Sequence, residues 1–336
     1  MRKALEIVAE KIRWIALFAL LVLGTLPLYV QSSYILRILT ISLMYVMIAL
    51  SLNLLTGFCG LMTLGHAAFW GIGAYTAAIL STRLGLGMGL SMLASGLFAG
   101  VVACVLGLTV LKLKGYYLTV VTLGFCEIVR LIEMNWMPVT RGPLGIARIP
   151  APNLFGIDLS SNMAIYYIIL ILAVLTALVV FSIVHSRIGL SIMACRDDDL
   201  AAGSIGINVY RCRVMVFVIS AVIVGISGAF YAHYISFIDP SSFTAAASID
   251  MLVMAIFGGL GSIPGTIIGA FVLTVLPETM RALAEYRTLI YGVLIVILMM
   301  VKPDGLLGNV NFKYIRQQLE QKRERVSVLP VKKDGR

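Results

Sequence analysis

Long runs without charged residues constrain this sequence more than any other feature. Residues 165–184 and 214–231 contain no Asp, Glu, Lys or Arg, and several other runs are nearly as apolar. The hydrocarbon core of a bilayer is about 30 Å thick, and an α-helix of about 20 apolar residues crosses it. The chain is only 12% charged, whereas soluble domains are about 25% charged. We therefore predict an all-α polytopic membrane protein.

The apolar runs predict about ten transmembrane segments. Two of them are unusual, because 60–81 is rich in glycine and 248–260 is short. Either could be a broken or re-entrant helix, which a membrane tolerates only where the backbone lines a cavity or is buried in protein. The predicted segments are 14–30, 34–54, 60–81, 90–111, 115–134, 163–184, 214–236, 248–260, 263–281 and 286–301.

The positive charges predict the orientation. The formal net charge is +10, and most of the 26 lysines and arginines lie before residue 14, at 112–114, in loop 185–213 and after residue 301. Cytoplasmic loops are enriched in Lys and Arg, so both termini are expected in the cytoplasm, with the chain in the inner membrane. Because these charges flank apolar segments, we infer that they orient the chain in the lipid bilayer, and we expect no nucleic-acid partner. Loop 135–162 then faces outside, and its four prolines predict irregular backbone.

The sequence offers no chemistry of its own for catalysis. It contains no GxxxxGK[ST] or HExxH motif and no CxxC pair among its five cysteines, so we expect free thiols, no metal, no cofactor and no enzymatic activity. The glycine-rich stretch 258–265 lies in an apolar segment and favours close helix packing. Energy for uphill transport would have to come from another subunit or from an ion gradient.

The loop 185–213 contains a predicted short amphipathic helix. An aspartate can cap its N-terminus, neighbouring carboxylates suit its positive end, and Gly206 suits a left-handed stop. We interpret it as a coupling helix that inserts into a partner. The alternative is a surface helix with no role in coupling. The residues assigned to coupling are Asp197, Asp198, Asp199, Leu200, Ala201, Ala202 and Gly206.

The fifth segment carries Glu127, Arg130 and Glu133, which we expect on one broad helix face. A charge at the centre of a span costs about 2.5–3.5 kcal/mol on insertion scales, so these groups should pair or face a wet cavity. They could form a local ion network that fixes packing, or they could take part in gating. His66 is interpreted mainly as a structural hydrogen-bonding residue, with a proton relay as the alternative.

Several motifs together resemble the branched-chain amino-acid ABC transporter permeases of the LivM type. The resemblance covers about residues 35–308 and lies in Leu52–Gly60, Leu64–Phe69, Gly115–Arg130, Thr140–Ile146, Arg196–Asn208, Gly258–Gly265, Glu285–Arg287 and Lys302–Gly308.

This resemblance implies the ABC importer permease fold, with two pseudo-symmetric halves. It also implies a second homologous permease subunit, two cytoplasmic ABC ATPase subunits that contact Asp197–Asn208, and a periplasmic substrate-binding protein. Residues 1–33 would hold the N-terminal segment and first span, 34–308 the transmembrane domain, and 309–336 a basic cytoplasmic tail.

Substrate would be branched-chain or related amino acids. Relatives that import urea or short amides are the alternative, and an ion-coupled secondary transporter is a further one. The candidate translocation path or gate comprises Gly57, Gly60, Gly65, His66, Glu127, Arg130, Gly259 and Gly261.

Overall fold

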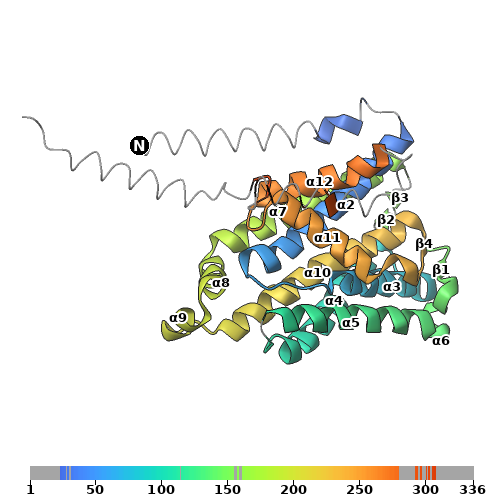
Figure 1. Cartoon of the computed structure of the whole chain (residues 1–336). Helices are drawn as coiled ribbons and strands as arrows, with labels where there is room; N and C mark the ends of the chain where they lie inside the picture. Colours follow the sequence, from blue (N-terminus) through green and yellow to red (C-terminus); the bar gives the residue numbers. More distant parts are fainter. Residues whose placement is uncertain are drawn as a thin grey trace, which may run out of the picture.

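The structure is a computed structural model that describes residues 23–27, 29, 32–113, 115–154, 157–158 and 161–279, with isolated positions up to 307. The expected spans 14–30 and 286–301 and the tail 309–336 lie wholly or mostly outside the described residues. The described part of the chain is a helical bundle with a few two-residue strands (Figure 1). Its main helices are α2 (Ser33–Asn53), α3 (His66–Leu84), α4 (Met88–Val110), α5 (Tyr116–Asn135), α7 (Asn162–His185), α10 (Val209–Ile235), α11 (Ala245–Gly258) and α12 (Ile263–Thr279).

These helices coincide closely with the predicted segments from 34–54 to 263–281. Within the described residues, five helices are long and apolar enough to cross a bilayer. They are Ser33–Phe58, Met88–Val110, Asn162–His185, Val209–Ile235 and Pro240–Gly258, of which the first and last include the short helical turns that adjoin α2 and α11. The all-α prediction is therefore confirmed, and these five helices have the length and composition of membrane spans.

Helix α10 lies at the centre of the bundle and packs against α2, α3 and α4 (Figure 1). Its backbone touches that of α3, because a Cβ at Gly225 or Gly228 would collide with α4 or α3 respectively, and one at Gly73 would collide with Gly225. Small residues allow this approach between membrane helices, where van der Waals packing replaces the hydrophobic effect. The fold thus depends on glycines spaced along two neighbouring helices.

Two glycine-rich segments interrupt the helices, as the sequence suggested. Helix α2 continues into a π-helical turn, η1 (Leu54–Phe58), and residues 59–65 are non-helical until α3 begins at His66. The predicted span 60–81 is therefore wrong at its start. Between α11 and α12 the chain reverses over a few residues, where Gly259 and Gly261 have φ of 114° and 79°. Such values are easy only for glycine.

The loop 135–162 is largely irregular, as predicted, but it begins with one helical turn, α6 (Met137–Thr140), followed by η2 (Gly142–Leu144). Pro138 is compatible with α6 because its missing N–H falls in the first turn. Strand β1 (Ile146–Ala147) pairs with β4 (Phe237–Ile238), which follows α10, and β2 (Asn153–Leu154) pairs with β3 (Ile157–Asp158). The β1–β4 pair ties this loop to the end of α10.

The loop 185–213 contains two helices rather than one. Helix α8 (Arg187–Asp197) precedes α9 (Asp199–Ser204), and the sequence reasoning missed it. The hydroxyl of Ser186 accepts a hydrogen bond from the Gly189 N–H and caps α8. Figure 1 shows α8 and α9 at the opposite end of the bundle from α6 and β4.

Candidate functional site

The two interrupted segments pack against each other. A Cβ at Gly57, in the π-helical turn, would collide with the backbone nitrogen of Gly261, in the turn between α11 and α12. The two backbones are therefore in contact only because position 57 is glycine. This contact brings together Gly57, Gly60, Gly259 and Gly261, which the sequence placed in one candidate path or gate.

Asn53 clamps the two segments. Its side chain is fully buried, accepts a hydrogen bond from the Gly261 N–H at 2.8 Å, and donates to Thr266 Oγ1 at 2.6 Å and to Ser262 O at 3.2 Å. One amide thus joins the end of α2 to the start of α12. A lone amide inside an apolar run could have marked this residue from sequence, because polar side chains within spans normally face a partner.

Arg196 connects these segments to the loop helices. It lies near the end of α8, and its Nη1 donates to the Gly57 carbonyl at 2.6 Å. Its side chain also covers Gly60, where a Cβ would lie 3.1 Å from Arg196 Cγ, and Gly261, where a Cβ would lie 3.4 Å from Nη1. We call Asn53, Gly57, Gly60, Arg196 and the turn 259–261 the glycine junction.

A later segment also reaches the glycine junction. The N–H groups of Leu306 and Leu307 donate to the carbonyls of Phe257 and Gly258 at the end of α11, at 3.0 and 3.1 Å. These two carbonyls are among the last of the helix, which lack partners within it. Residues 305–307 therefore cap α11 beside the turn that Arg196 contacts.

Helix α9 has the cap that the sequence predicted. The carboxylate of Asp198 accepts from the N–H groups of Leu200 and Ala201 at 2.8 and 3.1 Å, and Gly206 has φ of 87° just past the helix. Asp199 pairs with Arg213 at the start of α10, at 2.7 Å. Asp197 instead ends α8.

The expected apolar face of α9 is only partly correct. Ala202 is buried, exposing 2% of its surface, whereas Leu200 and Ile205 are 83% and 74% exposed, and Ala201 is exposed as well. The buried alanine packs inward, since successive helical residues turn by about 100°. Two large apolar side chains consequently remain uncovered at the tip of the loop.

His66 lies at the start of α3 and is held inside the bundle. Its Nε2 lies 2.9 Å from Ser220 Oγ and its Nδ1 lies 3.3 Å from Thr63 Oγ1, while Ser220 Oγ also donates to the Ser51 carbonyl. The imidazole therefore bridges α10, the end of α2 and the 59–65 segment. Neighbouring Gly65 packs on Thr122 of α5. This arrangement favours the structural interpretation of His66.

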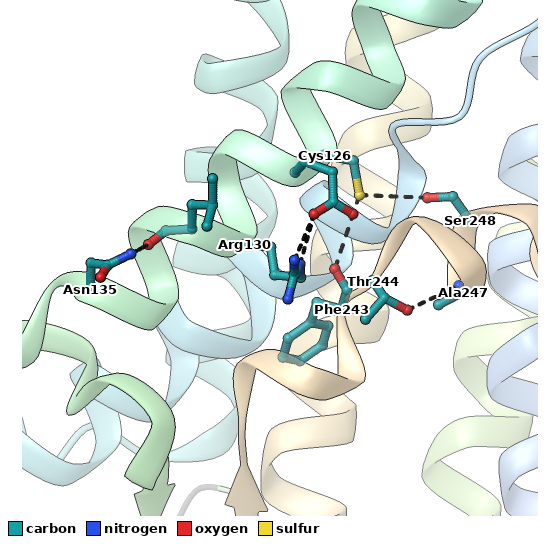
Figure 2. Close-up of polar contacts among 9 residues, drawn as sticks. Cys126, Arg130, Asn135, Phe243, Thr244, Ala247 and Ser248 are labelled. Carbon is teal, nitrogen blue, oxygen red and sulfur yellow. Dashed lines mark hydrogen bonds and ion pairs between the residues drawn. The ribbon is translucent and has the colours of Figure 1, made fainter.

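Glu127 and Arg130 form an ion pair on α5 (Figure 2). The distance from Arg130 Nη2 to Glu127 Oε2 is 2.8 Å, and the two side chains remain 27% and 35% exposed for Arg130 and Glu127. On the same helix, Cys126 Sγ lies 3.9 Å from Ser248 Oγ of α11. The charged pair thus lies at the edge of the contact between α5 and the segment that leads into α11.

Glu133 does not join that pair, although the sequence placed all three charged residues on one broad helix face. Six residues of α-helix turn the chain by about 600°, which leaves Glu133 about 120° away from Glu127 around the helix. Glu133 is buried, exposing 4% of its surface, and its Oε1 lies against Gly71 of α3. The two carboxylates therefore have different surroundings.

The described residues contain no cluster of three or more His, Cys, Asp or Glu that could hold a metal ion. All five cysteines are free thiols, as predicted. The geometry instead joins an exposed loop helix, through Arg196, to two breaks in the helices of the bundle. Such an arrangement suits the transmission of movement.

The chain matches the family model described as branched-chain amino acid transport system permease component, over residues 34–301. It is 37% identical to the high-affinity branched-chain amino acid transport system permease protein LivM of Escherichia coli, over 87% of this chain and 74% of the relative. It is 26% identical to the permease protein LivH of the same organism, over 80% of this chain and 92% of the relative. It is also 27% identical to the autoinducer 2 import system permease protein LsrC of Yersinia enterocolitica, over 95% and 87%. No solved structure gives a significant match.

Proposed function

Since this chain belongs to the family of branched-chain amino acid transport system permease components, we propose that it is a membrane-spanning subunit of an ATP-driven importer of branched-chain amino acids. It carries out no catalysis itself, and separate ATPase subunits hydrolyse ATP. Its partners are a second homologous permease, two cytoplasmic ATPases and a periplasmic substrate-binding protein. The names of the relatives support the substrate and the second permease, because LivM and LivH of one organism both match.

The proposed membrane arrangement has about ten spans in two pseudo-symmetric halves, with both termini in the cytoplasm. In this arrangement the glycine junction, α8 and α9 lie on the cytoplasmic side and loop 135–162 on the outer side. The placement of α8 and α9 at the opposite end of the bundle from α6 and β4 supports it. The excess of Lys and Arg near the proposed cytoplasmic segments supports it too.

The observation that carries the mechanism is the bond from Arg196 to the Gly57 carbonyl. In the proposed cycle, the ATPases contact the exposed Leu200 of α9 and the exposed Ile205 just after it. Their movement passes through α8 and Arg196 to the glycine junction, where the breaks beside α2 and α11 allow the helices to change their angles. The path would then open alternately to each side of the membrane.

The remaining path residues fall into two groups. Gly57, Gly60, Gly259 and Gly261 would form a cytoplasmic gate, with Gly65 and His66 supporting it from within the bundle. The partly exposed pair Glu127–Arg130 would face the second permease and the water-filled path, because charges that face lipid cost about 2.5–3.5 kcal/mol each.

Uptake with purified partners tests the coupling. Leu200→Glu should abolish both leucine uptake and co-purification of the ATPases, because a charge would replace an apolar contact. Leu144→Glu is the matched control, since Leu144 is 78% exposed in the outer loop, and should keep both. Gly206→Pro should stop uptake without preventing membrane insertion. Normal uptake by Leu200→Glu and Gly206→Pro would refute the coupling assignment.

A competition experiment separates the substrate classes. Proteoliposomes that contain the complex and its binding protein should accumulate labelled leucine, isoleucine or valine in the presence of ATP. Urea and short amides in large excess should not compete. Competition by urea, with no uptake of the three amino acids, would show that the permease belongs to an importer of urea or short amides instead.

A further inference from the structure

A buried carboxylate near the end of α5 lacks a partner. Glu133 exposes 4% of its surface, and neither carboxylate oxygen has a hydrogen-bond partner among the described residues. Burial of a polar group without a hydrogen bond is costly, and burial of a charge is costlier. An ionisable residue inside a transmembrane segment is by default a functional-site candidate.

Gly71 of α3 makes room for this carboxylate. A Cβ at position 71 would lie 2.6 Å from Glu133 Oε1 and 3.0 Å from Phe243 Cγ. The carboxylate and the Phe243 ring therefore lie side by side against bare helix backbone. Phe243 is 1% exposed and lies in the connection between η3 (Pro240–Ser242) and α11.

Two residues whose rings pack on Phe243 also carry buried polar atoms. Trp70 Nε1 and the Tyr75 hydroxyl have no hydrogen-bond partner among the described residues. The Trp70 and Tyr75 ring centroids lie 5.0 and 5.9 Å from that of Phe243. Tyr231 closes the group, 4.7 Å from Trp70 and 6.2 Å from Phe243. We call these four aromatic residues and Glu133 the Glu133 cluster.

The polar atoms of the Glu133 cluster complement one class of ligand. An ionised carboxylate only accepts hydrogen bonds, an indole N–H only donates, and a phenol can do either. An amino acid presents an ammonium group that donates, a carboxylate that accepts, and a side chain that is apolar in leucine, isoleucine and valine. Aromatic faces attract cations as well as apolar groups. Urea can donate N–H groups to a carboxylate but carries no positive charge, so it would leave the negative charge uncompensated.

We propose that the Glu133 cluster is a transient recognition site for the zwitterionic backbone of the transported amino acid. The substrate ammonium pairs with Glu133, its carboxylate accepts from Trp70 Nε1 and the Tyr75 hydroxyl, and its side chain contacts the rings. Because Phe243 fills the centre of the cluster in this conformation, substrate enters when the connection before α11 moves. This inference rests on the proposed function and adds to it the groups that select an amino acid over an amide.

Substrate protection of Glu133 tests the site. Dicyclohexylcarbodiimide modifies carboxyl groups in apolar surroundings, and peptide mass spectrometry of the reconstituted complex measures modification at Glu133. Millimolar L-leucine should reduce that modification several-fold during ATP turnover with the binding protein. Neither 4-methylpentanoate, which is leucine without its ammonium group, nor urea should protect. Equal protection by 4-methylpentanoate, or no protection by leucine, overturns the assignment.

Variants supply a second readout. At saturating binding protein, Glu133→Gln should lower the maximal rate of leucine uptake about tenfold to a hundredfold, the loss expected for one charge-assisted hydrogen bond. Tyr75→Phe and Trp70→Phe should lower it about threefold to tenfold. Tyr117→Phe and Trp136→Phe remove the same polar atoms from side chains that are 72% and 54% exposed and should transport normally.

The outcomes separate this inference from the proposed function. Wild-type rates for Glu133→Gln, Tyr75→Phe and Trp70→Phe would overturn the site and leave the importer assignment intact. If Glu133→Gln prevents assembly, the other two variants decide. Absence of leucine uptake by the wild-type complex would instead refute the substrate of the proposed function.

Discussion

Replacement of Gly57 by alanine tests the glycine junction most directly. The added Cβ would lie 1.9 Å from Asn53 Oδ1 and 2.4 Å from the Gly261 nitrogen. Ordinary van der Waals contact begins at 3.4 Å, so both groups would have to retreat by about an ångström or more. The backbone at Gly57 has no positive φ, so alanine itself is not strained there. The effect is therefore purely steric.

The loss of stability follows from the hydrogen bonds that Asn53 would lose. Moving its amide breaks three buried hydrogen bonds, to Gly261, Thr266 and Ser262. Each contributes about 1 kcal/mol net, and overpacking adds about 1–3 kcal/mol. We expect Gly57→Ala to lower the free energy of unfolding by about 4–6 kcal/mol and to abolish uptake, because the junction no longer closes.

Cys59 allows an unfolding assay, and Gly124 provides a matched control position. Cys59, beside the junction, is 1% exposed, so a thiol-reactive fluorescent dye will report thermal unfolding of the purified complex. A Cβ added at Gly124 on α5 would meet no other atom within 4 Å. Gly124→Ala should therefore keep or slightly raise the midpoint, because helix propensity adds up to about 1 kcal/mol to the free energy of unfolding. Equal midpoints and equal uptake for the two alanine variants would refute the close packing of Gly57 on Gly261.

Three other variants or measurements test separate parts of the account. Arg196→Met should reduce uptake per ATP hydrolysed about tenfold, as expected for loss of a hydrogen bond worth about 1.4 kcal/mol, whereas Arg187→Met on the exposed start of α8 should not; equal ratios in proteoliposomes would contradict the linkage. If the Glu127–Arg130 pair fixes packing, Glu127→Arg and Arg130→Glu should each lose uptake and the double swap should recover it, whereas no recovery would favour a role in the path. Burial raises the pKa of the Cys195 thiol, so its thiolate fraction at neutral pH falls below that of an ordinary cysteine. Maleimide should therefore label Cys195 more slowly in the folded complex than after denaturation. The labelling rate in the folded complex should still rise above about pH 9.

Much of the fold followed from local chemistry in the sequence. Apolar runs such as 165–184 predicted the helices closely, because a helix is the unit that satisfies its own backbone hydrogen bonds in an apolar environment. The same reasoning predicted the cap at Asp198 and the left-handed residue at Gly206, since both depend on atoms within a few residues of each other. The family motifs are likewise a property of the sequence alone.

Other features depended on contacts between distant residues. The sequence assigned Gly57 and Gly261 to one candidate path or gate, but only the folded chain showed that they pack on each other and that Arg196 joins them. Helix α8 was missed because Gly189 and Ser191 interrupt its apolar residues and lower its helix propensity. The sequence placed Glu133 on the same broad helix face as Glu127, and only the packing of α5 on α3 showed that Glu133 is buried while Glu127 stays partly exposed. Local periodicity determines which residues become helical, whereas the rotation of each helix toward its neighbours is a property of the whole bundle.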